Sequence, residues 1–383
     1  MLESPIVVRA VRARTIIWLF VLAAVAARYV GRSDGDWEEI FDATGLLFGV
    51  HGPIHHLPGG LHLYASYPEF QFGPLALIAA VPLWAAGWSA RWLAAAAMLG
   101  IGWASLVLID RAASGTGSAG TDVGAARPAR VEPAELGRLV GGVVAAVAWV
   151  PLAARYLHID DALAVLAIVG AVVAIRCERG VLAGLLVGAA IGCKPWAAPM
   201  MPMLAGLPRT QWRRAGAAAV AATAAVWLPF LIAAPSMVRA GSPQVDVSDA
   251  SVLRLFGVPG GIGPGWVRSV QLVVAGMCAT VAATRGRWTG VALVVLAVRI
   301  LVDPGTFEYY TSALVVAALV WDTVARSSAV PVATVCAALA LDLAEVVVAS
   351  ATARAVLRLG AVLGLVGWVT CAPIRRPRPI DCR

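Results

Sequence analysis

Charged residues are scarce in this chain. Asp, Glu, Lys and Arg make up only 14% of its 383 residues, whereas hydrophobic residues make up 60% and the mean hydropathy is +0.82. A soluble globular domain carries about 25% charged residues, so this composition excludes that class. Stretches of mostly Ala, Val, Leu and Gly recur along the chain, as in spanning helices of about 20 residues that pack closely. We therefore predict an all-α polytopic membrane protein that forms a single domain over residues 1–383.

Lysine and regularly spaced cysteines are also lacking. Lys194 is the only lysine among 30 basic residues, and the six cysteines are scattered along the chain. Their spacing predicts neither a disulfide framework nor a zinc site. The net charge of +8 comes from arginines in short clusters between apolar runs rather than on one continuous face. We therefore expect no nucleic-acid partner.

The arginine clusters predict the orientation in the membrane, because positive residues favour the cytoplasmic side. Arg9, Arg12 and Arg14 precede the first apolar stretch and place the N-terminus in the cytoplasm. We favour a retained first helix over a cleaved signal peptide, although Ala24-Val25-Ala26 resembles a cleavage site. If the later clusters also face the cytoplasm, the chain crosses the membrane about twelve times, and both termini are cytoplasmic. The predicted spans are 15–30, 91–109, 139–154, 162–175, 181–194, 196–208, 215–234, 267–284, 288–302, 310–325, 330–350 and 355–371.

One apolar segment does not fit this topology as a span. Gly73–Trp88 is interrupted by Pro74 and Pro82, and a crossing there would move every later arginine cluster outside. We therefore expect an interfacial or re-entrant segment that walls a cavity, since irregular backbone at membrane depth needs such surroundings. Residues 112–133 are rich in Gly, Ala, Ser and Thr, which is typical of a flexible cytoplasmic linker.

The predicted outer face collects most of the polar residues. Its first loop, residues 31–73, holds four of the five histidines and the carboxylates Asp34 and Asp36. These aspartates either cap the amphipathic helix that ends near residues 46–49, or one of them acts as a general base. The Asp-Gly-Asp triplet and the histidines invite a metal interpretation, but their spacing is loose and lacks the HExxH pattern. We therefore expect no metal site.

Lys194 lies between two short apolar segments, in the sequence Gly-Cys-Lys-Pro-Trp. Its side chain either snorkels from a helix end to the membrane surface or provides a positive point charge for a phosphate group. In the second case Arg155, Arg239, Arg254 or Arg268 are its candidate companions.

Four short motifs, in a fixed order and within the predicted topology, resemble a known family. They are Asp36 followed by Leu46-Leu47-Phe48-Gly49, then Tyr67-Pro68-Glu69-Phe70-Gln71-Phe72-Gly73-Pro74-Leu75, then His158-Ile159-Asp160-Asp161, and then Gly192-Cys193-Lys194-Pro195-Trp196. They resemble the GT-C superfamily of integral-membrane glycosyltransferases, and more narrowly the actinobacterial polyprenyl-phosphate-mannose-dependent mannosyltransferases of glycosyltransferase family 87. The resemblance covers most of the chain and implies a GT-C-like bundle of about twelve helices.

The resemblance implies transfer of a sugar at the outer face of the cell membrane. The donor would be a polyprenyl-phosphate sugar, with mannose expected first and arabinose, glucose or another sugar left open. The acceptor would be a glycolipid or glycan of the cell envelope, and transfer would invert the anomeric centre without a metal or other cofactor. In this mechanism Asp36, with Asp34 as the alternative, takes the proton from the acceptor hydroxyl.

The resemblance also implies roles for residues later in the chain. Lys194, Arg155 and Arg254 would stabilise the departing polyprenyl phosphate. The sugar or the acceptor would be bound by His158, Asp160, Asp161, Tyr67, Glu308, Tyr309 and Tyr310. From the residues alone, Asp160 and Asp161 equally fit carboxylates that stabilise a helix N-terminus.

Two positions depart from the family pattern. Glu308, before Tyr309, stands where relatives often carry the histidine of a His-Tyr pair. Tyr67-Pro68-Glu69 stands where many relatives have two successive prolines.

A secondary transporter or flippase of an envelope precursor is the main alternative, since many spans and intramembrane charge also mark transport pathways. No repeat between the two halves is evident, because the long polar loop after the first span has no counterpart in the second half. Asp342 and Glu345 would form either a proton relay or, as we favour, a structural contact with Arg354 or Arg358. A scaffold for envelope assembly is the third class, and it predicts that no single carboxylate is essential.

Overall fold

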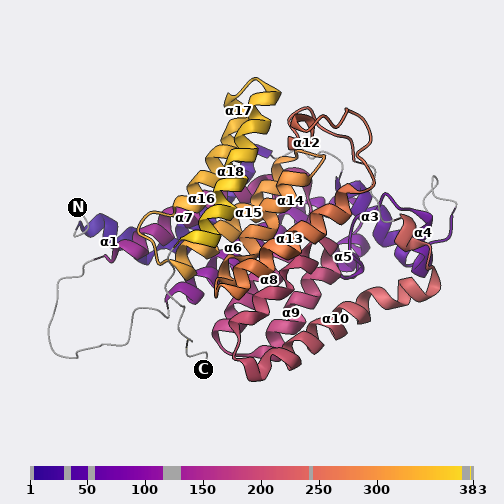
Figure 1. The fold of residues 1–383 in the computed structure, drawn as a ribbon, viewed down its shortest axis with the longest axis horizontal. Helices are drawn as coiled ribbons and strands as arrows, with labels where there is room; N and C mark the ends of the chain where they lie inside the picture. The colour runs from indigo at the N-terminus through magenta and orange to yellow at the C-terminus, as the bar shows by residue number, and fades with distance from the viewer. Residues whose placement is uncertain are drawn as a thin grey trace.

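The regular structure of this protein is helical. Within the residues that the computed structural model describes, no β strand is present, and one isolated antiparallel bridge joins Asp246 to Ile262. The described residues are 4–29, 36–50, 57–114, 131–240, 245–372 and 380. Figure 1 shows the helices packed into one bundle. The α helices are α1 (Pro5–Arg12), α2 (Arg14–Ala26), α3 (Asp36–Leu47), α4 (Leu63–Ser66), α5 (Pro74–Ala85), α6 (Arg91–Ser114), α7 (Pro133–Val150), α8 (Ile159–Arg176), α9 (Gly180–Cys193), α10 (Trp212–Ala233), α11 (Met237–Ala240), α12 (Val252–Leu255), α13 (Val267–Thr284), α14 (Val291–Val302), α15 (Glu308–Val320), α16 (Val332–Ala337), α17 (Ala344–Val347) and α18 (Ala351–Cys371).

Several of these helices continue through tighter or wider turns. π-helical turns extend α7 through Pro151–Tyr156 and α15 through Trp321–Ala325, and another joins α16 to α17 at Ala338–Leu343. A 3₁₀ helix, Pro195–Gly206, follows α9 and contains two internal prolines. Because proline lacks the N–H that an α helix needs, the predicted span 196–208 forms this tighter helix instead.

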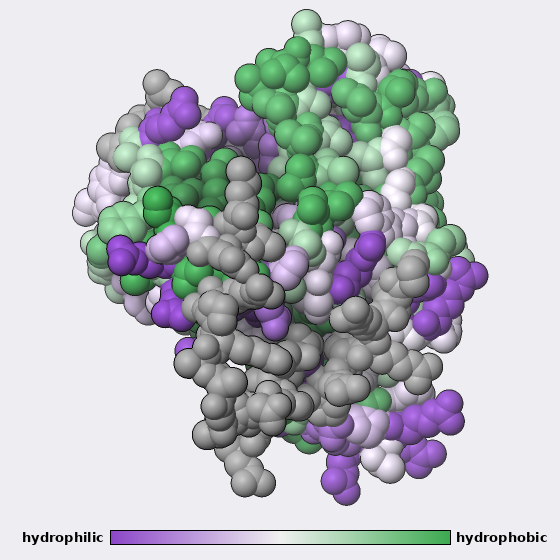
Figure 2. Space-filling model, turned by 90° about the vertical axis from the view of Figure 1, so that its left-hand side faces the viewer, coloured by the Kyte–Doolittle hydropathy of each residue, from purple (hydrophilic) through white to green (hydrophobic). Residues whose placement is uncertain are grey.

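Five helical segments are long and apolar enough to cross a membrane. They are Trp88–Ser114, Pro133–Tyr156, Arg209–Ala233, Val267–Thr284 and Ala351–Cys371. A sixth crossing is present if Pro5–Arg12 and Arg14–Tyr29, which are bent by 74°, form one span. Large apolar side chains such as Phe20 and Ile232 are exposed on the outside, and Figure 2 shows apolar residues spread over the upper right of one face. These features confirm the predicted class of all-α membrane protein, while the arrangement of about twelve spans stays a prediction.

Small residues allow α9 to pack closely against α10. A Cβ added at Gly188 would lie 2.6 Å from the carbonyl oxygen of Ala219, and one at Gly184 would clash with the backbone of Ala215. Backbones approach this closely in membrane bundles where Gly and Ala line the contact. Since α9 also packs against α8, its C-terminal end is held firmly where Lys194 follows.

The predicted first outer loop contains helices in both of its described parts. α3 ends at Leu47, which confirms the amphipathic helix predicted to end near residues 46–49. α5, in the segment predicted to be re-entrant or interfacial, is about 18 Å long. A straight α helix of that length is shorter than a hydrocarbon core of about 30 Å, and the position of α5 in the membrane stays a prediction.

Two predictions are wrong in detail. The predicted linker 112–133 starts too early, because Ala112–Ser114 form the last turn of α6 and Ala112 and Ala113 are buried. Residues 115–130 of that linker lie outside the described residues. The spacing of the cysteines predicted no disulfide framework, yet Cys177 is disulfide-bonded, because distance along the sequence does not reveal which cysteines meet in space.

Candidate functional site

A buried ion pair joins the start of α8 to the end of α9. Lys194 directly follows α9, and its ammonium hydrogen-bonds to Asp160 and lies 3.7 Å from Asp161 Oδ2. Both aspartates are in the first turn of α8, where the helix dipole favours negative charge. All three side chains are buried. Burial alone would raise the pKa of the Asp160 carboxyl, but the Lys194 ammonium and His158 together outweigh burial and hold that pKa below its usual range.

Arg299 on α14 adds a second buried cation. Its Nη1 lies 3.3 Å from Asp161 Oδ1, and its Nε lies 3.9 Å from Asp303 Oδ2. The guanidinium also lies over two aromatic rings, 4.9 Å from the centroid of Trp196 and 4.5 Å from that of Tyr310. Trp196 donates from Nε1 to the same Asp161 oxygen over 2.7 Å. Carboxylates and aromatic faces therefore fix the orientation of Arg299.

Arg268 and Gln271 on α13 complete the arrangement. Arg268 Nη1 lies 3.0 Å from both Asp303 Oδ2 and Gln271 Oε1. Gln271 in turn donates to the backbone carbonyl of Arg299 over 2.9 Å. Three basic side chains are thus balanced by three carboxylates. We call these six residues the ion-pair cluster: Lys194, Arg268, Arg299, Asp160, Asp161 and Asp303.

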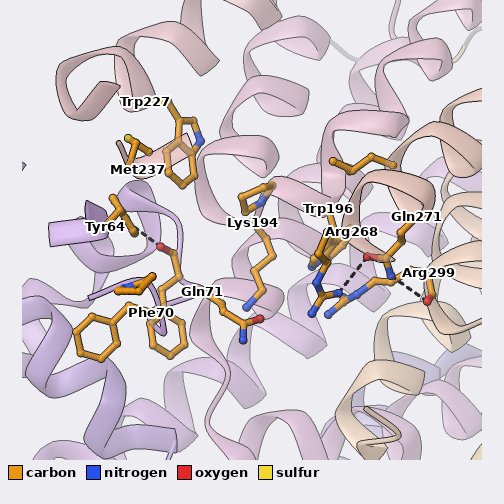
Figure 3. A pocket seen from close by; sticks show the side chains of 14 residues that line it. Tyr64, Phe70, Gln71, Lys194, Trp196, Trp227, Met237, Arg268, Gln271 and Arg299 are labelled. Atoms are coloured by element: carbon orange, nitrogen blue, oxygen red, sulfur yellow. Dashed lines mark hydrogen bonds between the residues drawn. The ribbon is translucent and has the colours of Figure 1, made fainter. Parts of the chain in front are cut away.

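A cavity of about 300 Å³ opens beside the ion-pair cluster (Figure 3). All three basic residues of the cluster line it, and Gln71 and Gln271 add amide groups. Figure 3 shows the end of the Lys194 side chain next to Gln71, with Arg268 and Arg299 entering from the α13 and α14 side. The described lining includes no carboxylate, so the cluster presents its positive groups to the cavity. The remaining walls are mostly aromatic and apolar: Tyr64, Pro68, Phe70, Phe72, Pro195, Trp196, Trp227, Met237 and Leu272.

His158 lies beside the ion-pair cluster. Its ring stacks on that of Tyr309 with centroids 3.8 Å apart, and its Nδ1 is 3.4 Å from Asp160 Oδ1 and 3.8 Å from Asp161 Oδ2. Ligand atoms of His158, Asp160 and Asp161 lie within 4.8 Å of one another, so these residues have the donor types of a metal site. Lys194 already places a cation against both carboxylates, so this group needs no metal ion for charge balance.

Five of the predicted site residues belong to the ion-pair cluster or contact it: Lys194, His158, Asp160, Asp161 and Tyr310. A sixth, Tyr309, stacks on His158. Others have different partners. Arg155 pairs with Glu308 over 2.8 Å, and Arg254 lies at the surface, where it donates to a backbone carbonyl of its own turn. The Tyr67 hydroxyl donates to the backbone carbonyl of Leu57 over 2.8 Å. None of these four side chains is part of the described cavity lining.

The candidate base Asp36 is the first residue of α3. The next residue, Trp37, donates to the backbone carbonyl of Trp88, beyond the C-terminal end of α5. Gly73, just before α5, donates instead to the carbonyl of Cys193 at the cavity over 2.8 Å. Because α5 is about 18 Å long, the start of α3 and the cavity lie toward opposite ends of it. Four other residues of interest in this loop lie outside the described residues: Asp34, His51, His55 and His56.

Several cavity residues were not singled out by the sequence. Arg299 does carry a signal, because it is the only charged residue of the apolar helix α14, and intramembrane charges commonly mark functional sites. Gln71 and Gln271 carry no comparable signal. Of the arginines expected to accompany Lys194, Arg268 alone belongs to the described lining.

Comparisons with protein-family models, with curated proteins and with solved structures give no match to this chain. The resemblance to GT-C glycosyltransferases therefore stays a prediction that rests on the short motifs and their order.

Proposed function

We propose that this protein is an integral-membrane glycosyltransferase. It transfers a sugar, with mannose as the first candidate, from a polyprenyl-phosphate donor to a glycolipid or glycan acceptor of the cell envelope. The reaction takes place at the outer face of the cell membrane and inverts the anomeric centre. The observation that carries the proposal is a cavity that combines three basic side chains with aromatic and apolar walls.

The two kinds of wall match the two chemical parts of a polyprenyl phosphate. Lys194, Arg268 and Arg299 offer N–H donors to the phosphate. Rings such as those of Tyr64 and Trp227 offer apolar faces to the isoprenoid chain and the sugar. Because three carboxylates hold the basic groups in place, the donors are arranged before the phosphate departs, which favours stabilisation of the leaving group.

The proposal also needs a carboxylate that takes a proton from the acceptor hydroxyl. We assign this role to Asp36, with Asp34 as the alternative, because of the resemblance of the first outer loop. A general base must approach the hydroxyl to within about 3 Å, whereas α3 begins toward the end of α5 that is remote from the cavity. Glu69 is therefore a third candidate, since it lies between Pro68 and Phe70, which both line the cavity.

The topology predicted from the arginine clusters belongs to the same proposal. It has about twelve crossings, both termini in the cytoplasm, and α5 as a re-entrant or interfacial wall of the cavity. Phe72 and Gly73 support this place for α5, because Phe72 lines the cavity and Gly73 bonds to Cys193. Asp160 and Asp161 then position Lys194 and leave contact with the sugar to other residues.

Transfer by the purified protein tests the proposal. Wild type, Asp36→Asn and Glu69→Gln are placed in nanodiscs with labelled polyprenyl-phosphate-mannose and extracted cell-envelope lipids as acceptors. We expect transfer by wild type and by Glu69→Gln, and none by Asp36→Asn, whose donor binding and thermal stability stay unchanged. Loss in Glu69→Gln with retention in Asp36→Asn would move the base to Glu69. Retained transfer in the presence of a chelator is the expected result for a reaction without metal.

Absence of transfer by wild type with several polyprenyl-phosphate sugars would contradict the proposal. That result would favour a transporter or flippase, in which the same cavity carries an anionic lipid across the membrane.

A further inference from the structure

Helix α1 is set apart from the helix that follows it. Pro5–Arg12 and Arg14–Tyr29 meet at a bend of 74°. The second segment is about 24 Å long, which approaches the thickness of a hydrocarbon core of about 30 Å. α1 therefore adds little to a crossing by α2, and if α2 crosses, α1 runs close to the membrane plane.

The two sides of α1 differ in chemistry. Arg9 and Arg12 are three residues apart, so they share one side of the helix, and both are exposed. Among the described residues, neither arginine has an ion-pair partner. Ile6 lies three residues before Arg9, so it shares this side with the arginines, and it is 78% exposed. Val11, on the opposite side, is buried, and α1 packs against α7. The exposed side of α1 thus combines two arginines with an apolar residue, a mixture suited to the headgroup level of a membrane, where arginine side chains extend toward the phosphates.

The bend between the helices is held by contacts within the bundle. Arg14 donates two hydrogen bonds of 2.9 Å to the Asp110 carboxylate and one of 2.8 Å to the carbonyl of Val11. Trp103 donates to the carbonyl of Thr15 over 2.9 Å, and its side chain is partly exposed. Arg14 is thus used inside the protein, while Arg9 and Arg12 are left outside.

We propose that α1 lies in the membrane interface and binds the phosphate groups of anionic lipids through Arg9 and Arg12. Ile6 enters the boundary between headgroups and acyl chains, and Val11 holds the helix on the bundle. Anionic lipid is the partner that complements two exposed arginines at the level of the headgroups. Each arginine near an anionic surface contributes about fivefold in affinity, or about 25-fold for the pair. This interaction is independent of the proposed glycosyl transfer.

Amide hydrogen exchange of residues 5–12 tests this proposal on the full chain in nanodiscs. One set of nanodiscs contains phosphatidylcholine alone, and the other contains phosphatidylglycerol. For wild type we expect exchange in α1 to slow by up to about 25-fold in the anionic lipid. The variant Arg9→Gln/Arg12→Gln should lose this difference, and Ile6→Asp should exchange faster in both lipids.

Arg111→Gln is the matched control, because Arg111 is an exposed arginine at the end of α6 and leaves α1 intact. It should show the wild-type dependence on lipid. Unchanged exchange in α8 and α9 confirms that every variant is folded. Equal exchange of wild-type α1 in both lipids, or a lipid dependence that persists in Arg9→Gln/Arg12→Gln, would overturn the proposal.

Discussion

Two groups of paired charges differ in what surrounds them. In the hairpin of α17 and α18, Glu345 accepts hydrogen bonds from Arg354, over 3.0 Å, and from Arg358. We call these three residues the hairpin cluster. Its partners lie 9 and 13 residues apart in the sequence, whereas Asp161 and Arg299 of the ion-pair cluster are 138 residues apart. Of the two clusters, the ion-pair cluster alone lines the described cavity.

This difference separates a structural role from a binding role. A buried ion pair is seldom more stabilising than an apolar contact of the same volume, so charges gathered from four distant segments call for a second reason. In the proposed function, the open cavity lined by the positive groups supplies that reason, namely an anionic ligand. The hairpin cluster does not line the cavity that the described residues form, and Asp342 nearby accepts a hydrogen bond from Thr311. These contacts support the structural interpretation of Asp342 and Glu345.

Lys194→Met is expected to have the largest effect on stability. It leaves Asp160, which is fully buried, without its counter-ion, and loss of one partner of a buried pair costs about 3–5 kcal/mol. Unfolding in denaturant reports the change in free energy. The double variant Asp160→Asn/Lys194→Met should recover a substantial part of this loss. A double variant as unstable as the sum of the two single ones would show that the pair is not coupled.

Gly73→Ala tests the close contact between the apolar wall of the cavity and the end of α9. An added Cβ would lie 2.5 Å from the carbonyl oxygen of Cys193 and closer still to that of Gly192, both of which are backbone atoms that cannot rotate away. We expect a loss of about 3 kcal/mol, at the upper end for overpacking, and weaker donor binding because Phe72 is displaced. Gly87→Ala is the control. A Cβ added there meets open space, but the backbone φ of 86° strains alanine. This variant should therefore lose stability without losing donor affinity.

Glu345→Gln tests the structural role of the hairpin cluster. It removes charge from the hydrogen bonds to Arg354 and Arg358, and we expect a loss of about 2 kcal/mol in the free energy of unfolding. Donor affinity should stay at the wild-type value. A large fall in donor affinity with this variant would mean that the hairpin cluster also takes part in binding.

Trp196→Phe should give the smallest effect. It removes the hydrogen bond to Asp161 but keeps an aromatic ring under Arg299, so stability should fall by about 1.5 kcal/mol. Because the orientation of Arg299 is partly preserved, donor affinity should fall only a few-fold. Trp196→Leu should reduce it further, and equal affinities for the two variants would show that the ring is not used.

The sequence predicts the membrane class well, because composition and apolar stretches depend on local information. The same holds for α3 and for the carboxylates at the start of α8. The meeting of Lys194 with Arg299 depends on how α9 packs against distant helices, which no local pattern contains. Arg155 and Arg254 were expected at the phosphate site because of their charge and predicted side, but nearby partners hold them elsewhere.

The affinity of the purified protein for a polyprenyl phosphate without sugar tests the role of the cavity most directly. Arg268→Gln keeps Asp303 bonded to Gly305 and removes one positive group from the cavity, whereas Arg254→Gln removes an arginine from the surface. We expect Arg268→Gln to weaken binding about tenfold or more, as for loss of a charge-assisted hydrogen bond, and Arg254→Gln to bind as wild type does. Wild-type affinity in Arg268→Gln, or an equal loss in both variants, would contradict a phosphate site at the ion-pair cluster.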